Sequence, residues 1–543
     1  MNKINKKCPF YFLHPILNYL DYKCDDDKCN LIISKINEAI YIRFFVKIYI
    51  WLIYFLSFIP GFIKINKNII LFKFVAGVVI LIFESDTTFN TKSIPSKKID
   101  SSRIYDTVVV GSGPGGAIAA LRCVEKGEKV LIVESGSSFK PESIEHHSLE
   151  QTTKQFNQQG MSFCLGNSPM LYAEGSTYGG GSEVNSGLYF KLSGPHREKF
   201  LEKAGISEDE WVKKESEVEN IINVQSSPKN TYRELNSALI RGSNKLELTV
   251  EEIPRWRVFK PKVEHQSMQV TYLKQAEKLG LEIITDTEIY KINNQKEVLV
   301  LLGKSKNGDR KDLIEIRTHK IVLSAGTVNT PKLLKKSNLL SDKVRFNFHP
   351  MTRCVVDYGE DINDGDLFPP YQSWTKDYKY KFGYSVSSFP FVRATLASLG
   401  EFNKIPKLSN LVCYFSSTVL EESKGRILFF RDKAIPIIYI TKNDREKIKK
   451  GFELLKEIMT AAKVKKIWPK KANPSLTSVH IFGSLPINKC KDLGKYGELL
   501  RNPNIKISDS SLLPVAPWGN PQAVMMVLNE ILIDKWLKSL ESS

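Results

Sequence analysis

The amino-acid sequence predicts an α/β protein built around a Rossmann-like nucleotide-binding unit. Three observations within residues 105–134 support this fold: a short run rich in β-branched residues, a glycine-rich turn that opens a helix, and a second apolar run that ends on an acid. The chain has 543 residues, 42% of them hydrophobic, so it can bury a large core and is long enough for two or three domains.

The glycine-rich turn matches the pattern G-x-G-x-x-G in Gly111, Gly113 and Gly116, directly after the predicted strand 105–110. Gly111 permits the tight turn out of the strand, Gly113 lets the backbone approach a pyrophosphate, and Gly116 allows the helix to pack close to the sheet. The free N–H groups and partial positive charge at the start of the helix then face the phosphates. The turn therefore predicts a dinucleotide site.

The second half of this unit indicates which dinucleotides fit. The helix is expected to end at Gly127, and the following strand closes on Glu134. A carboxylate at this place accepts hydrogen bonds from a ribose diol and repels a 2′-phosphate, which argues against NADP. The unit alone does not separate FAD from NAD.

Charge and cysteine content exclude other classes of protein. The formal net charge of +19 suits an anionic membrane surface or a nucleic acid, but the basic residues are spread along the chain without a nucleic-acid-binding motif. We therefore expect no nucleic-acid partner. Eight cysteines in a chain of this length indicate reduced thiols rather than a disulfide framework. Cys24 and Cys29 have no second Cys/His pair at metal-site spacing, so we expect no metal.

The first 102 residues are expected to form an apolar region followed by a polar linker. The apolar run 48–63 has 16 residues. As a helix it is about 24 Å long, short of the roughly 30 Å of hydrocarbon in a bilayer. With the second run, 74–83, it fits an interfacial helical hairpin over residues 44–83 that contacts a membrane surface. A pair of helices packed on the main body is the other interpretation. No secretory signal opens the chain, which favours the cytoplasmic side.

A second glycine-rich segment, GSTYGGGSEVNSGLYF at 175–190, has too many glycines and small hydroxyls to form a regular helix or strand. Its GG-x-S-x-x-N core resembles a signature of the glucose–methanol–choline (GMC) oxidoreductases. Two further segments resemble this family: VLSAGTVNTPKLLKKS at 322–337, and the closing stretch ISDSSLLPVAPWGNPQAVMMVLNE. The motifs occur in the family's order from about residue 104 to 540, and the closest resemblance is to the branch of long-chain alcohol oxidases.

The resemblance implies FAD as the cofactor. Motif positions assign it the residues Gly111, Gly113, Gly116, Glu134, Gly179, Gly180, Ser182, Asn185, Gly326, Asp509 and Pro521. Covalent attachment in this family often uses a histidine near the glycine-rich loop, and none lies between Gly160 and Gly194, so we expect non-covalent FAD.

The resemblance also implies a discontinuous FAD-binding domain and a substrate domain with an antiparallel sheet. The FAD-binding domain is expected over 103–190, 265–350 and 475–543, and the substrate domain over 191–264 and 351–474.

Oxidising an alcohol requires a base for the hydroxyl proton and a hydride acceptor above the carbon. His480 matches the family's catalytic histidine, and an imidazole can take and return a proton near neutral pH. Asn520 stands at the family's second catalytic position, where its amide can hold the substrate oxygen. His349 is expected to be structural or to lie near the flavin. Aromatic residues such as Phe389, Phe391, Tyr414 and Phe415 fit either the wall of an apolar cavity or the inward face of an ordinary sheet.

The sequence thus predicts oxidation of a primary or secondary alcohol to an aldehyde or ketone, with proton abstraction at His480 and hydride transfer to flavin N5. The family branch and the apolar N-terminal region favour an apolar or long-chain alcohol, and oxygen or a quinone-like compound as electron acceptor. The alternative is a non-oxidative enzyme of the same fold, of the hydroxynitrile lyase or fatty-acid photodecarboxylase type.

Overall fold

The computed structural model describes most of the chain after residue 88. The described residues are 89–96, 102–160, 162–228, 233–259 (without the side chains of 233–237), 263–294, 298–306, 313–341, 343–363, 370–399, 401, 407–469 and 476–542. The apolar segment 44–83 lies outside them, so its contact with a membrane stays a prediction. Within the described part, no helix combines the length and the apolar character needed to cross a bilayer.

Five parallel strands form the centre of the first sheet, in the order β9-β2-β1-β12-β24. Val109 of β1 pairs with Ile132 on one side and Val322 on the other, and all three side chains are buried. The bounds are β1 Ile104–Val110, β2 Val130–Val133, β9 Glu282–Ile284, β12 Leu313–Leu323 and β24 Asn502–Ile507, with β10 Thr287–Asn294, β11 Leu299–Ser305 and β23 Glu498–Leu499 paired at the margins. This central parallel sheet confirms the Rossmann-like α/β fold expected from the sequence.

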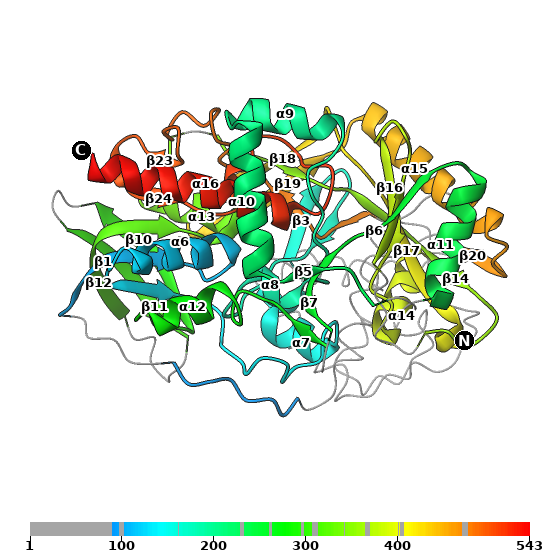
Figure 1. Ribbon diagram of the computed structural model, residues 1–543, viewed down its shortest axis with the longest axis horizontal. Coiled ribbons are helices and arrows are strands. Elements are labelled where there is room, and N and C mark those ends of the chain that lie inside the picture. The colour runs from blue at the N-terminus through cyan, green and yellow to red at the C-terminus, as the bar shows by residue number, and fades with distance from the viewer. Residues whose placement is uncertain are drawn as a thin grey trace, which may run out of the picture.

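Three helices pack against one another beside this sheet: α6 (Pro114–Glu125), α12 (Tyr272–Lys278) and α16 (Pro521–Glu541) (Figure 1). The fully buried carboxylate of Glu530 in α16 joins them. It accepts hydrogen bonds from Arg122 Nε of α6 at 2.8 Å and from Tyr272 Oη of α12 at 2.8 Å. Because a buried carboxylate needs such partners, this contact fixes how α6 lies relative to the end of the chain.

A second, larger sheet has thirteen strands among the described residues, most of them antiparallel. Its bounds are β3 Ser162–Gly166, β4 Met170–Tyr172, β6 Thr249–Glu252, β13 Arg345–Phe348, β14 Met351–Asp357, β15 Tyr371–Trp374, β16 Tyr380–Tyr384, β17 Leu411–Thr418, β18 Lys424–Phe430, β19 Lys433–Tyr439, β20 Lys466–Trp468, β21 Leu476–Ser478 and β22 Ile481–Phe482. Strands β3, β4, β13, β21 and β22 come from segments expected in the FAD-binding domain, so the two parts share this sheet. The domain bounds stay a prediction.

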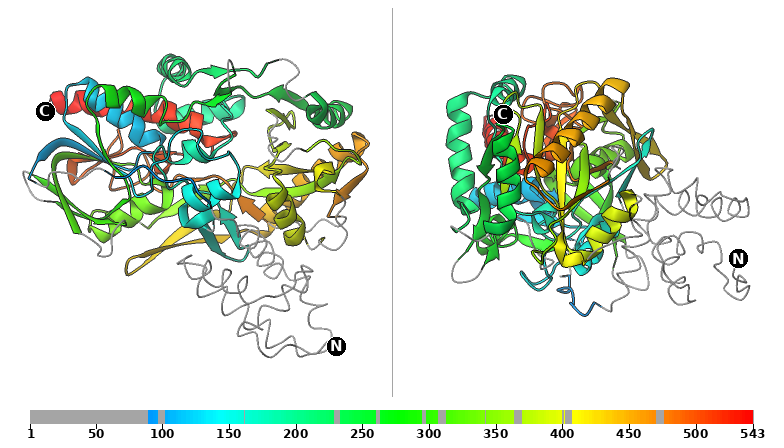
Figure 2. Two further views of the ribbon diagram at one scale, coloured as in Figure 1. Left: turned by 90° about the horizontal axis from the view of Figure 1, so that it is seen from below. Right: turned by 90° about the vertical axis from the view of Figure 1, so that its right-hand side faces the viewer.

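Helices α11 (Arg233–Lys245) and α15 (Lys442–Ala461) cover the outer face of the large sheet (Figures 1 and 2). Tyr414 of β17 packs there with Phe452 and Leu455 of α15, all fully buried. The opposite face of the same strands is turned toward the glycine-rich segments. α13 (Gly326–Lys336) contacts strands of both sheets, β10 on one side and β19 on the other.

The other helices are α7 Leu149–Gln155, α8 Gly181–Val184, α9 Pro195–Ala204, α10 Glu208–Ile221 and α14 Phe389–Leu399, and a small separate sheet contains β5 Val224–Gln225, β7 Arg255–Val258 and β8 Glu264–His265. α14 packs against β14 and β17 of the large sheet, and α10 packs against α16.

Candidate active site

A cavity of about 990 Å³ lies between the two sheets. Ligand cavities in proteins span about 300–1,000 Å³, so this one has room for a large ligand. Ten of the residues singled out from the sequence are on its wall: Gly111, Gly113, Glu134, Gly180, Asn185, Gly326, His480, Asp509, Asn520 and Pro521. Segments far apart in the sequence thus converge on one site.

Gly113 lies where the first strand passes into α6, and its backbone is extended (φ −61°, ψ 176°). A Cβ added there would meet only the Cα of Gly180, 4.0 Å away. Gly180 needs its missing side chain more directly, because it has φ +59° and its Cβ would lie 2.6 Å from the Cα of Gly113. The two glycine loops therefore meet backbone to backbone. The N–H groups that open α6 have no side-chain cap, which leaves them available to an anion.

Glu134 is 5% exposed at the end of β2. Its Oε2 accepts hydrogen bonds from Ser112 N at 2.9 Å and Ser112 Oγ at 2.7 Å, and its Oε1 accepts one from Gly136 N at 2.8 Å. A further contact, from Ser135 Oγ to Oε1 at 3.4 Å, is long. Since a carboxylate has about four acceptor positions, Oε1 keeps one that a ribose hydroxyl can use.

Three residues assigned to the cofactor lie away from the cavity wall: Gly116, Gly179 and Ser182. A Cβ on Gly116 would come within 2.0 Å of Gly111 O, so its absence allows α6 to approach the turn. Ser182 is fully buried, donates to Gly179 O at 2.7 Å and accepts from Met268 N at 3.0 Å. These contacts shape the glycine loops behind the wall.

Asp509 joins the closing segment to the start of α13. Its Oδ2 accepts hydrogen bonds from Gly326 N at 2.9 Å and Thr330 Oγ1 at 2.5 Å, while Oδ1 accepts from Ser511 N at 2.8 Å. Burial raises the pKa of this carboxyl group. Two motifs that lie far apart in the sequence, SAG-x-x-x-T and D-x-S, are therefore hydrogen-bonded to each other through the side chain of Asp509.

Asn520 caps α16 without a side-chain hydrogen bond to that helix, and Pro521 occupies its first turn. The Oδ1 of Asn520 accepts a long hydrogen bond, 3.4 Å, from Lys381 Nζ. Among the described residues nothing accepts a hydrogen bond from its Nδ2. Asn185 contacts the same helix, because its Nδ2 donates to Gln522 Oε1 at 2.6 Å.

His480 lies between β21 and β22, at the cavity wall, and contacts His349. The ladder of β13 and β22 pairs Phe348 with Ile481, which puts the two histidines next to each other at its end. His349 N donates to His480 O at 3.2 Å, and the two Nδ1 atoms are 3.2 Å apart. The Nε2 of His349 lies 2.9 Å from Pro517 O.

These contacts fix the tautomers of both rings. A carbonyl oxygen only accepts, so His349 carries its proton on Nε2 and leaves Nδ1 as an acceptor. His480 must then donate from Nδ1, and its Nε2 keeps a lone pair. Burial lowers the pKa of His349 to about 3 and that of His480 well below its ordinary value of 6.5, so both rings are neutral at pH 7.

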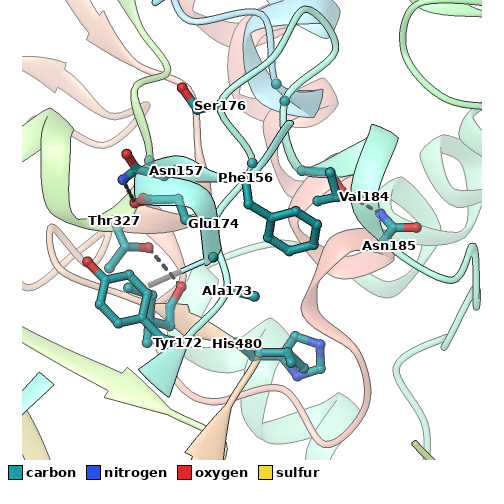
Figure 3. Close-up of a pocket in the computed structure, with 18 of the residues that line it drawn as sticks. Phe156, Asn157, Tyr172, Ala173, Glu174, Ser176, Val184, Asn185, Thr327 and His480 are labelled. Carbon is teal, nitrogen blue, oxygen red and sulfur yellow. Dashed lines mark hydrogen bonds between the residues drawn. The ribbon is translucent and has the colours of Figure 1, made fainter. Parts of the chain in front are cut away.

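The segment before the glycine loop supplies another part of the wall. Figure 3 shows Phe156 and His480 projecting into the same space from different elements, with Glu174 to one side. Glu174 accepts a hydrogen bond from Asn157 Nδ2 at 2.8 Å, and burial raises its pKa to about 7. Phe156 is not marked by a pattern in the sequence, whereas Glu174 directly precedes the glycine-rich segment 175–190.

Two polar residues at this site, Lys381 and Arg353, were not noticed in the sequence, although both line the cavity. His349, expected to be structural or to lie near the flavin, contacts the ring of His480. Of the aromatic residues left open, Phe391 and Phe415 line the cavity, and Tyr414 packs on the opposite face of the sheet. Phe389 begins α14 and does not line the cavity.

The arrangement fits FAD. A wide cavity begins at an uncapped helix N-terminus, where phosphates bind, and passes a buried carboxylate suited to a ribose. It extends to a neutral histidine whose Nε2 is free to take a proton.

Comparisons with known proteins agree with this arrangement. Residues 152–351 match a family model described as GMC oxidoreductase, and residues 106–144 match one described as FAD binding domain. An uncharacterized GMC-type oxidoreductase from Sinorhizobium fredii is 23% identical over 78% of this chain and 92% of that protein. A long-chain-alcohol oxidase from Arabidopsis thaliana is 25% identical over 71% of this chain and 57% of that protein. The crystal structure of pyridoxine 4-oxidase from Mesorbium loti superposes with a TM-score of 0.64, 15% identity and coverage of 80% of this chain and 99% of that one, which shows a shared fold.

Proposed function

We propose that the chain is an FAD-dependent enzyme of the GMC oxidoreductase family that acts on CH–OH groups, and that His480 is the base that deprotonates the alcohol. One observation carries the proposal. Pro517 O accepts a hydrogen bond from His349, and His349 Nδ1 in turn accepts one from His480 Nδ1. The lone pair of His480 is therefore on Nε2, which has no protein partner among the described residues. His480 also lines the cavity.

The same contacts support the charged state that follows proton transfer. When Nε2 takes the hydroxyl proton, His480 becomes an imidazolium and still donates from Nδ1 to the lone pair of His349. That acceptor stabilises the new charge and holds the ring in place.

Asn520 complements this base. Its Nδ2 is free of protein acceptors among the described residues, so it can donate to the alcohol oxygen and orient the carbon that loses the hydride. FAD, when bound, accepts that hydride. The alcohol thereby becomes an aldehyde or ketone, and its former hydroxyl proton is on His480.

We also propose that the alcohol has an apolar body and that oxygen takes up the electrons. Phe156, Phe391 and Phe415 on the cavity wall support an apolar body, since an aromatic wall binds hydrocarbon by burying it. The similarity to long-chain-alcohol oxidases supports both oxidation and oxygen as the electron acceptor.

The direct test is anaerobic reduction of the purified protein. We expect it to carry a flavin spectrum, and we expect the oxidised flavin band to disappear when alcohols from short to long chain length are added without oxygen. The amount of aldehyde or ketone should equal the amount of flavin reduced. A flavin band left unchanged by every alcohol would refute oxidation and favour the lyase or photodecarboxylase alternative.

Replacing His349 tests whether it positions the base. We expect His349→Ala to lower kcat by about 10- to 100-fold, the usual range for a residue that orients a catalytic ligand, with little change in KM. The alanine variant also admits water beside His480, so the pKa of that ring rises from its lowered value toward 6.5. A base works only when unprotonated, so the acid limb of kcat/KM should move to higher pH. Partial recovery in His349→Asn, whose Oδ1 can still accept from His480, would separate positioning from a fold defect.

A further inference from the structure

The cavity wall opposite the glycine loops is one face of the large sheet. The pairing of three strands shows which residues lie on this face. Lys381 of β16 pairs with Ser417 of β17, and Ser417 pairs with Met351 of β14. Two residues farther along, Phe415 pairs with Arg353. Side chains of paired residues share a face, and all five line the cavity.

Lys381 is buried, with 4% of its surface exposed. Among the described residues, no carboxylate contacts its ammonium group. Its contacts are the long hydrogen bond to Asn520 Oδ1 and the rings of Phe190 and Phe415, whose centroids lie 5.0 and 6.0 Å from Nζ. Two of its three N–H donors therefore have no acceptor in the described part of the chain. Burial lowers its pKa to about 7, which agrees with a site that lacks a negative partner.

Arg353 is a second cation on the same wall. Its Nε donates to Ser385 Oγ at 2.8 Å, and among the described residues no acceptor binds the other two guanidinium nitrogens. Strand spacing puts the Cα atoms of Lys381 and Arg353 roughly 12 Å apart, with Phe415 in the row between them. Both side chains are long enough to reach a ligand in the intervening space.

Lys381 and Arg353 both face this cavity, and a negative group on a ligand there would pair with Arg353 and favour the charged form of Lys381. The FAD phosphates belong at the opposite wall, at the start of α6. Lys381 instead contacts Asn520, which the proposed function places at the alcohol oxygen. We propose that the substrate is an alcohol carrying a carboxylate, which Lys381 and Arg353 bind while the reacting hydroxyl lies at His480 and Asn520. This inference rests on the proposed function and specifies its substrate class: a hydroxy acid with an apolar body.

The test compares each hydroxy acid with its uncharged methyl ester. The substrates are octanoates with a hydroxyl at the second, third or terminal carbon, the methyl ester of each, and octanol. We expect the wild-type enzyme to prefer one of the acids over its ester by about tenfold or more in kcat/KM, the order of one charge-assisted hydrogen bond. Equal values for every acid and its ester would overturn the proposal.

Substitutions then locate the preference. We expect Lys381→Met and Arg353→Met each to lower kcat/KM for the preferred acid by roughly 30-fold, as when one partner of a buried charge pair is removed. Arg353→Met, whose side chain contacts Ser385 and not Asn520, should leave the ester within about threefold. Lys381→Met removes the hydrogen bond to Asn520 as well, so it should slow the ester too, but less than the acid. Lys379→Met is the matched control, because Lys379 is exposed and paired with Asp377; it should change neither substrate. An equal loss for acid and ester in the two cavity variants would refute carboxylate binding and assign these residues to the reacting oxygen or to the fold.

A binding measurement separates this inference from the proposed function. Octanoate has no hydroxyl to oxidise, so its dissociation constant for the FAD-loaded enzyme, measured by calorimetry, does not depend on turnover. We expect weaker octanoate binding in Lys381→Met and Arg353→Met, with the flavin spectrum unchanged as a check on folding. Unaltered octanoate binding in both variants would contradict the inference, whether or not alcohols reduce the flavin.

Discussion

His480→Ala is expected to lower the rate of flavin reduction by about 10²- to 10⁴-fold, the range in which a positioned general base contributes. The variant keeps the cavity and Asn520 but has no group that can take the hydroxyl proton. Hydride cannot leave the carbon readily while the oxygen keeps its proton, so both kcat and kcat/KM should fall. Stopped-flow absorbance of the flavin band under anaerobic conditions measures the step directly.

Two further variants show whether the loss reflects the base. His480→Gln retains a polar side chain that can donate toward His349, but an amide is not a base, so it should be as slow as His480→Ala. His319→Ala removes an exposed histidine from β12 and should leave the rate unchanged. Reduction in His480→Gln at more than about a tenth of the wild-type rate would contradict the assignment, because the loss of a base is larger than that.

The nucleotide-binding unit was predictable because its signals are local. Strand 105–110, the glycines that follow it and Glu134 occur within thirty residues, and each has a conformational or hydrogen-bonding reason to be there. The family resemblance, which the comparisons confirm, extended the prediction to His480 and Asn520. Such motifs indicate which residues form the site and in what order they occur along the chain, but not which of them are in contact.

The polar wall of the cavity was not predictable, because it depends on strand pairing over long distances. His349 and His480 are 131 residues apart and meet only because β13 pairs with β22. Lys381 and Arg353 face the cavity because of the register of β14, β17 and β16, and a shift of one residue in any of these pairings would turn them to the α15 side. Sequence alone specifies neither the partners nor the register.

Gly113→Val is expected to produce a folded protein without FAD. The backbone of Gly113 is extended, a conformation that valine readily adopts, and a Cβ there has no close protein neighbour. The added side chain instead occupies the space in front of the first N–H groups of α6, where the pyrophosphate must approach. Overpacking of this kind costs about 1–3 kcal/mol, and loss of the phosphate contacts adds to it, so FAD affinity should fall by roughly 100-fold or more.

The neighbouring glycine supplies the control that makes this result interpretable. A Cβ on Gly115 would lie 1.8 Å from Ser508 O, so Gly115→Ala must push α6 away from the closing segment and lower the melting temperature of the protein itself. Gly113→Val should keep the far-UV circular dichroism and melting temperature of the FAD-free wild type and lose only the flavin absorbance. A Gly113→Val protein that retained one flavin per chain would show that the pyrophosphate does not bind at this turn. One that melted as early as Gly115→Ala would show that Gly113 is required for packing rather than for the ligand.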